Sequence, residues 1–260
     1  MTAPRMSADK IIKELGISEP SDIDVEAIAQ FCGATIVYER LTGCEARIVG
    51  NAERAIITVN AEARRGRQRF SAAHELGHWM RDRNQAGFSC TNALFRSQWG
   101  TVNPERGANE FAADLLLPQT IFGRHAYASP VTLQAVRELA WKFDTSLAAT
   151  AIRLVQHGSF PAMVIYLSQG VRKWFVAGPD VPSTLSPRET PGGNTVAGEL
   201  LHGGDASVGP QAVQADGWLT HAKSEWYELM EDSVKFRDGS ILSLLWWKNE
   251  KQIIDLMDDD

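Results

Sequence analysis

The segment HELGH, residues 74–78, places two histidines four positions apart, with a glutamate beside the first. On a helix, His74 and His78 project from one face about one turn apart, so both can reach one Zn²⁺ at about 2.0–2.1 Å. Glu75 lies about 100° round the helix, too far to chelate with them. Its carboxylate can take the proton from a water on the metal and later give it to a leaving amine. The motif therefore indicates a zinc peptidase, although these letters also fit an ordinary helix with two histidines.

The residues around the motif favour a helix that faces a core. Phe70, Ala73 and Met80 continue an apolar stripe beside the histidines. Gly77 removes a side chain between them, at a cost of about 1 kcal/mol in helix propensity. An ordinary solvent-facing helix has no use for that gap, whereas a site built against another backbone does.

A catalytic zinc site needs a third protein ligand and one open position. The metzincin class is excluded, because Arg81 and Asn84 stand where its extended motif requires Gly and His. The other common solution is a carboxylate on the next helix. That helix reads PERGANEFAADLLLP, residues 104–118, and offers Glu105, Glu110 and Asp114.

The apolar positions of this helix choose among the three acids. Positions 108, 112 and 115 mark one face, and Glu105 extends that face by one turn, whereas Glu110 and Asp114 lie on a different side. We predict that Glu105 is the third ligand. The alternative is a first-turn acid that is favoured only by the helix dipole.

HELGH followed by E-x-x-A-N-x-F-A-A-x-L-L-x-P resembles the ImmA/IrrE family of zinc metallopeptidases. The likeness extends to ITVN at 57–60 and covers roughly residues 8–157. Many members carry an extra Glu where this chain has Gly107, which leaves Glu105 as the only acid at that turn. The resemblance implies a cytoplasmic endopeptidase that cleaves a helix-turn-helix transcriptional repressor after a stress, DNA-damage or phage signal.

The elements expected around these motifs make the fold class α+β. Residues 1–128 are predicted to form a zincin-like metallopeptidase domain. It mixes helices and strands, with a loop between the two ligand helices. We expect helices at 8–15, 25–31, about 67–83 and 104–118, strands at 34–38, 46–49 and 55–59, and the loop at 84–103.

Residues 129–158 are predicted to form a helix-turn-helix-like segment, with helices at 131–143 and 146–156. Residues 131–157 carry three basic and two acidic residues, which is poor for phosphate contacts. A packing role is therefore favoured over DNA contact.

Residues 159–260 differ in composition from the rest. Their net charge is −7 against +1 for residues 1–160, and they hold five of the eight tryptophans. Strands are expected at 162–167, 172–177 and 241–247, with a helix or strand at 224–232. The family resemblance suggests a GAF- or PAS-like α/β sensor domain, whose tryptophans could stack on a small molecule or on single-stranded DNA. Core aromatics are the alternative explanation.

Other residues are candidates for supporting roles. His125 and Tyr127 could stabilise the oxyanion of a tetrahedral intermediate. Cys90 lies between the two ligand helices and could act as an inhibitory fourth zinc ligand. The cluster Arg64–Arg69 could steer an acidic substrate or DNA toward the metal helix, or form a solvated face.

Composition excludes several classes of protein. No apolar run approaches the roughly 20 residues of a membrane span, and the polar start does not look like a signal peptide. Three cysteines without CxxC spacing suit a reducing cytoplasm. A net charge of −6 argues against a general nucleic-acid coat. The competing hypothesis is a DNA-binding transcriptional regulator whose metal site is structural or vestigial.

Overall fold

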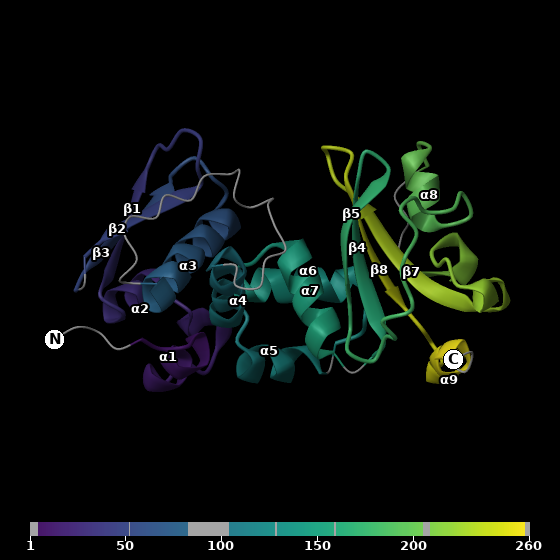
Figure 1. The fold of residues 1–260 in the computed structure, drawn as a ribbon, viewed down its shortest axis with the longest axis horizontal. Coiled ribbons are helices and arrows are strands. Elements are labelled where there is room, and N and C mark those ends of the chain that lie inside the picture. Colours follow the sequence, from purple (N-terminus) through teal and green to yellow (C-terminus); the bar gives the residue numbers. More distant parts are fainter. Residues whose placement is uncertain are drawn as a thin grey trace. The chain divides into compact units, whose positions relative to one another are not determined.

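The structure is a computed structural model, and it describes residues 5–51, 53–82, 104–127, 129–158, 160–204 and 209–257. It is a mixed α+β fold with a three-stranded and a five-stranded sheet, drawn in Figure 1. The chain divides into two compact units. The first comprises Met1–Phe122 and Ala140–Ser146, and the second comprises Gly123–Leu139 and Leu147–Asp260.

The first unit is built on the three-stranded sheet, in the order β1-β3-β2. Strand β1 is parallel to β3, and β2 is antiparallel to it. Alternate residues of β3, Ala55, Ile57 and Val59, are buried, so one face of the sheet packs on the core. These elements are α1 (Ala8–Glu14), η1 (Pro20–Asp22), α2 (Val25–Phe31), β1 (Ala34–Glu39), β2 (Ala46–Gly50) and β3 (Ala55–Asn60).

Two longer helices complete this unit, namely α3 (Arg65–Asp82) and α4 (Pro104–Leu116). Helix α3 packs on all three strands and most extensively on α4. Pro104 starts α4, where a missing backbone N–H costs nothing. The predicted helices and strands of this region are confirmed to within two or three residues at their ends. Pro118 follows α4, as predicted, but the further helix after it, α5 (Gln119–Ala126), was not predicted.

Helices α6 (Leu133–Phe143) and α7 (Leu147–His157) follow, and their bounds agree closely with the predicted pair. The turn between them, residues 140–146, is counted with the first unit. Phe143 is buried there, and its ring centroid lies 5.4 Å from that of Phe122. The peptidase, helix-turn-helix-like and sensor roles of segments 1–128, 129–158 and 159–260 remain predictions.

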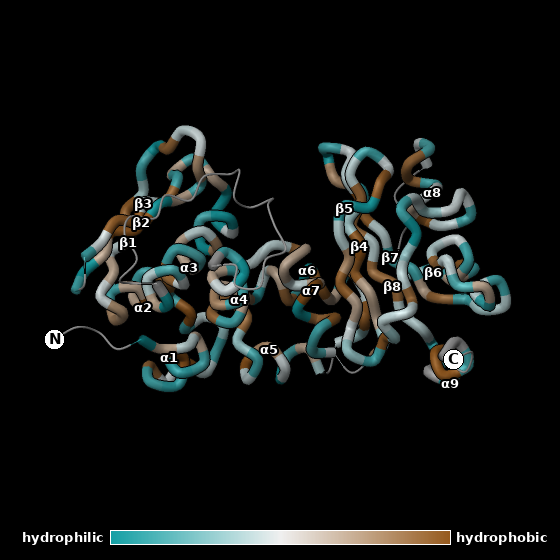
Figure 2. The backbone as a smooth tube through the Cα atoms, viewed as in Figure 1, coloured by the Kyte–Doolittle hydropathy of each residue, from teal (hydrophilic) through white to brown (hydrophobic). Residues whose placement is uncertain are grey.

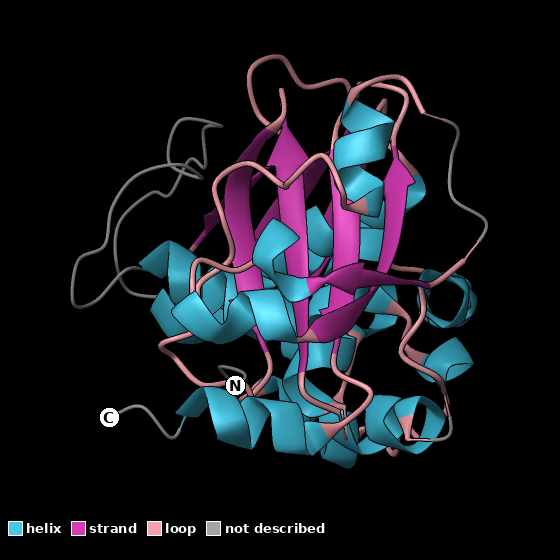
Figure 3. Cartoon of the chain, turned by 90° about the vertical axis from the view of Figure 1, so that its right-hand side faces the viewer, coloured by secondary structure: helices cyan, strands magenta, loops and turns pink. Residues whose placement is uncertain are grey.

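The second unit contains an antiparallel sheet in the order β5-β4-β8-β7-β6, whose strands run side by side in Figure 3. Its central strands β4 and β8 are the most hydrophobic, as Figure 2 shows. Helix α7 lies against β4 and β5, and α8 contacts β7 on the opposite face. The remaining elements are β4 (Ala162–Ser168), β5 (Val171–Ala177), α8 (Val196–Leu201), β6 (Gln211–Gln214), η3 (Ala215–Gly217), η4 (Ala222–Trp226), β7 (Glu228–Lys235), β8 (Ile241–Trp246) and α9 (Glu250–Met257).

A buried carboxylate organises the core of this unit. Glu231 on β7 is fully buried and accepts hydrogen bonds from the backbone N–H groups of Val196 and Ala197 at the start of α8. It also accepts from the indole of Trp218 at 2.8 Å and the hydroxyl of Ser233 at 2.6 Å. The carboxylate therefore fixes α8 against the sheet.

In the part of the chain that the structure describes, no helix has the length and apolar character to cross a bilayer.

Candidate metal centre

Helix α3 carries the three residues of the HELGH motif that could do chemistry. His74, Glu75 and His78 are all buried. The imidazole rings of the two histidines are nearly perpendicular, with an interplanar angle of 83°, and their Nε2 atoms lie 3.2 Å apart. The helical spacing therefore brings both nitrogens to one point, as the motif predicts.

Gly77 lets α4 approach this face of α3. A Cβ atom at Gly77 would lie 3.0 Å from Cα and 3.1 Å from the carbonyl oxygen of Ala108. It would also lie 3.2 Å from Cβ of Phe111. The glycine thus serves the close helix crossing that the sequence suggests, and this crossing brings a carboxylate of α4 to the histidines.

That carboxylate belongs to Glu105. Its Oε2 lies 3.2 Å from Nε2 of His74, and its Oε1 lies 3.4 Å from Nε2 of His78. Glu110 is exposed and pairs with Arg106 at 2.8 Å on another side of α4. Among the described residues, His74, His78 and Glu105 form the group that could hold a metal ion.

The spacing of these atoms suits a tetrahedral ion. Ligand atoms placed at about 2.0–2.1 Å from zinc and at tetrahedral angles lie about 3.3–3.4 Å from one another. The two Nε2 atoms lie 3.2 Å apart, and they lie 3.2 Å and 3.4 Å from the two different oxygens of Glu105, so these separations are close to that value. Two imidazoles and one carboxylate are also a donor set that zinc takes in catalytic sites. The residues present therefore fit the metal that the motif implies.

The other ring nitrogen of His74 is oriented by α4. Nδ1 of His74 lies 3.0 Å from Oδ1 of Asn109, one helical turn beyond Glu105. With this oxygen as the acceptor, the proton sits on Nδ1 and the lone pair of Nε2 points toward Glu105 and His78. Asn109 was part of the family motif, but nothing in the sequence gave it this role.

Electrostatics favour the neutral form of His74. Burial lowers the pKa of His74 to about 4, and the neighbouring His78 acts in the same direction. The carboxylate of Glu105 and the hydrogen bond to Asn109 oppose this shift without cancelling it. The imidazole is therefore neutral near pH 7, which is the form that ligates a metal.

The other candidate residues are His125, Tyr127 and Cys90. His125 is partly buried in the last turn of α5, and Tyr127 is 83 % exposed just beyond it. Both belong to the second unit, so their role at the oxyanion stays a prediction. Cys90 and the whole of the predicted loop 84–103 lie outside the described residues.

Comparison with protein families supports the geometry. Residues 30–155 match the IrrE N-terminal-like domain, which defines a family of peptidases. These residues belong to that peptidase family. The resemblance to ImmA/IrrE proteins, drawn from the two motifs, is thereby confirmed, and the match includes both α3 and α4 of this IrrE-like chain.

One solved structure shares the fold of almost the whole IrrE-like chain. It is described as a Mycobacterium tuberculosis transcriptional regulator, with 14 % sequence identity and a TM-score of 0.61. The likeness covers 97 % of this chain and 79 % of that one. At this identity the comparison shows the fold alone. No curated protein matches the sequence.

Proposed function

We propose that the chain is a zinc-dependent endopeptidase. His74, His78 and Glu105 would hold the metal, and Glu75 would act as the general base. The observation that carries this proposal is the convergence of two imidazole nitrogens and the carboxylate of Glu105, at separations of 3.2 to 3.4 Å, beside the buried Glu75. A structural zinc site has no need of that glutamate and closes all four positions with protein ligands.

The protein side chains divide the work of peptide hydrolysis. Zinc, when bound, acts as a Lewis acid that polarises the scissile carbonyl and lowers the pKa of a water to about 7. Glu75 accepts a proton from the attacking water and delivers it to the nitrogen that leaves as an amine. The carboxylate thus ends each turnover in its starting state. Asn109 holds His74 in the tautomer that turns Nε2 toward the metal.

The proposed substrate is a helix-turn-helix transcriptional repressor, cut after a stress, DNA-damage or phage signal. This part of the proposal rests on the family resemblance. A repressor is also a substrate whose destruction would need control, and a second unit on the same chain offers a place for it. A cytoplasmic location would follow from such a substrate.

The second unit is proposed to be a GAF- or PAS-like sensor for a small molecule or single-stranded DNA. Its first and last strands, β4 and β8, pair at the centre of a five-stranded antiparallel sheet. This arrangement, with helices on both faces, supports a PAS-like assignment. Two of its tryptophans, Trp218 and Trp247, lie in the hydrophobic core of this unit.

The alternative function is a DNA-binding regulator whose metal site is structural or vestigial. The printed description of the similar solved structure keeps this alternative in view. It predicts DNA binding that survives the loss of Glu75 and no peptide hydrolysis by the wild-type protein.

The deciding experiment compares the wild type with Glu75→Gln. Because this change removes a base and leaves all three ligands in place, zinc content should be unchanged. Cleavage of purified helix-turn-helix repressors, followed by mass spectrometry, should fall at least about 100-fold. Wild-type cleavage rates in Glu75→Gln would refute the mechanism.

The ligand assignment is tested separately by metal analysis. Glu105→Ala should lose most of the bound zinc, since a three-ligand site tolerates no missing member. Glu110→Ala is the matched control, because its carboxylate points to Arg106. Retention of zinc by Glu105→Ala together with its loss in Glu110→Ala would overturn the assignment.

A further inference from the structure

A polar pocket lies at the N-terminal end of α3, and none of the metal ligands lines it. Its volume is about 300 Å³, at the lower end for ligand pockets. Arg69, one of its walls, precedes His74 by five residues on the same helix. The pocket is lined by Glu26, Tyr38, Ala61, Arg65, Gln68 and Arg69.

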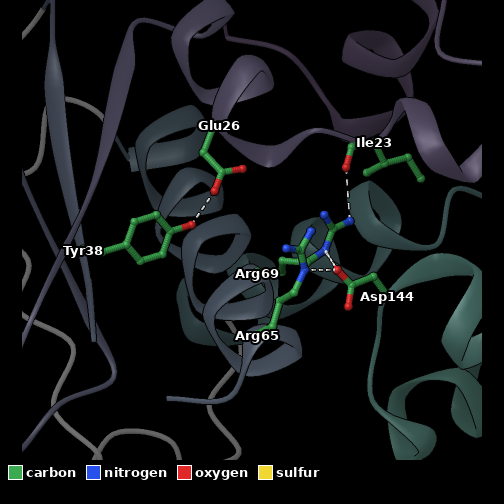
Figure 4. A network of polar contacts seen from close by, with 6 residues as sticks. All are labelled: Ile23, Glu26, Tyr38, Arg65, Arg69 and Asp144. Atoms are coloured by element: carbon green, nitrogen blue, oxygen red, sulfur yellow. Dashed lines mark hydrogen bonds and ion pairs between the residues drawn. The ribbon is translucent and has the colours of Figure 1, made fainter. Parts of the chain in front are cut away.

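Two guanidinium groups of this pocket share one carboxylate oxygen. Nε of Arg65 lies 2.5 Å from Oδ2 of Asp144, while Nε of Arg69 is 3.7 Å from the same oxygen. The longer distance is outside hydrogen-bonding range. Figure 4 shows both side chains converging on this acid. Asp144 therefore neutralises one of the two cations, and the pair keeps an excess positive charge.

Of the two arginines, Arg69 has the larger desolvation cost, because its guanidinium is the less exposed one. Its side chain is 11 % exposed, and it donates through Nη2 to the carbonyl oxygen of Ile23 at 3.1 Å. Its Nε is buried and has no hydrogen-bond partner among the described residues. A guanidinium removed from water to this degree gains from a second acceptor at the pocket wall.

The residues of α3 around this pocket add positive charge, which the acids Glu26 and Asp24 of the neighbouring segment oppose. The first turn of α3 contains no acidic residue, and the helix dipole is positive at this end. Arg64 and Arg67 lie in the same stretch. The opposing acid at the pocket wall is Glu26, whose carboxylate accepts a hydrogen bond from the hydroxyl of Tyr38. The side of the pocket formed by α3 is therefore the anion-binding side.

We propose that this pocket binds a carboxylate side chain of an acidic polypeptide segment, as a substrate-docking site beside the metal helix. The proposal rests on the proposed peptidase function for the identity of the polypeptide as substrate. The pocket suits one side chain in volume, and Arg65 at its rim is 78 % exposed and can engage a chain that passes outside. Arginine is well matched to a carboxylate, because its planar donors form two parallel hydrogen bonds.

The test measures binding and does not depend on cleavage. The probes are two fluorescent decapeptides of alanine and serine, one with a central Glu-Glu pair and the other with Gln-Gln. Binding to the full zinc-loaded chain is followed by anisotropy, with Glu75→Gln as a second host that cannot cut them. The glutamate peptide should bind about tenfold more tightly than the glutamine peptide, and high salt should remove the difference.

Variants locate the site. Arg65→Gln should weaken the glutamate peptide by about five- to tenfold, because it removes an exposed donor of the pocket. Arg69→Lys keeps the charge but loses the planar donors, and should weaken binding to a similar extent. Arg64→Gln, a neighbouring exposed arginine outside the pocket, should change affinity by less than about twofold. Circular dichroism confirms that each variant is folded.

Three results would overturn the proposal. They are equal binding of the two peptides, equal effects of Arg64→Gln and Arg65→Gln, and displacement of the peptide by inorganic phosphate or a single-stranded oligonucleotide at lower concentration than by free glutamate. The last result would assign the pocket to phosphate. Failure of Glu75→Gln to abolish cleavage would refute the proposed mechanism and leave these binding results untouched.

Discussion

At the scale of single residues, the site combines local and distant information. The spacing of His74 and His78 is readable from five letters, because helical geometry alone brings i and i+4 together. Glu105 could be selected from three acids by the face of its helix. Asn109 could not be assigned, since its partner His74 is 35 residues away and only the packing of α3 on α4 joins them.

The hydrogen bond that Asn109 accepts from His74 should strengthen zinc binding. Asn109→Ala removes the acceptor that fixes the tautomer of His74, so zinc affinity should fall about 10- to 100-fold. Competition with a chromophoric chelator measures this loss, and histidine ¹⁵N NMR reports the tautomer in the metal-free protein. Glu110→Gln, on an exposed side of the same helix, is the control. Unchanged affinity and tautomer in Asn109→Ala would show that His74 is oriented by other contacts.

At the scale of elements, the helices and strands with strong local sequence signals were predictable. Short elements that are held by contacts with distant residues were not. The periodicity of apolar residues predicts helices α3 and α4, and Pro104 marks the start of α4. Helix α8 has six residues in a Gly- and Pro-rich stretch, and its first N–H groups donate to Glu231, more than 30 residues later. Strand β6 has four residues, of which only Val213 is buried. Such elements form because of tertiary partners that no sequence window contains.

Two glycine substitutions should have opposite effects on stability, because Gly77 lies at the crossing of α3 and α4 whereas Gly123 on α5 does not. Gly77→Ala places a methyl group against the backbone of Ala108, and we expect a loss of about 1–3 kcal/mol in the free energy of unfolding. Gly123→Ala on α5 meets nothing within 4 Å and should gain about 0.5–1 kcal/mol from helix propensity. Urea denaturation measures both. A stabilised Gly77→Ala protein would mean that the two helices can separate at little cost.

Glu231 predicts a stability effect in the second unit. Glu231→Ala leaves buried donors on α8, Trp218 and Ser233 without their acceptor, so the free energy of unfolding should fall by at least about 1–3 kcal/mol. Glu228→Ala, an exposed position on the same strand, should change it by less than about 0.5 kcal/mol. Equal effects would contradict the proposed bracing of α8.

The same carboxylate has a pH signature of known sign. Burial raises the pKa of Glu231 in the folded state, while its hydrogen bonds lower it only in part. A raised pKa means that the folded protein holds this proton more tightly than the unfolded chain. Its contribution is therefore greatest below the ordinary carboxyl range and declines as the pH rises through the folded pKa. The melting temperature of the wild type should therefore fall as the pH rises through this range, and that of Glu231→Gln should not show this fall.

At the scale of the whole molecule, the α+β class and the order of the longer helices and strands could be predicted from the sequence, together with the change in composition after residue 160. What composition could not show is that the chain weaves between its two units. The turn Ala140–Ser146 belongs to the first unit, while the residues on both sides of it belong to the second. The reason is physical, because Phe143 and Asp144 find their partners on Phe122 and on the two arginines of α3.

This weaving has a consequence for dissecting the protein by truncation. A fragment that stops at residue 122, or at the predicted boundary of 128, would expose Phe122 and deprive Arg65 and Arg69 of the carboxylate of Asp144 that they share. A fragment that continues to residue 158 would keep both partners. We expect the shorter fragment to melt at a lower temperature and to aggregate, and the longer one to stay folded and retain zinc, as differential scanning fluorimetry and metal analysis would show. Equal stability of the two fragments would mean that the turn Ala140–Ser146 does not stabilise the first unit. If the expected difference is found, the smallest piece of this chain able to hold its metal is longer than its motifs suggest.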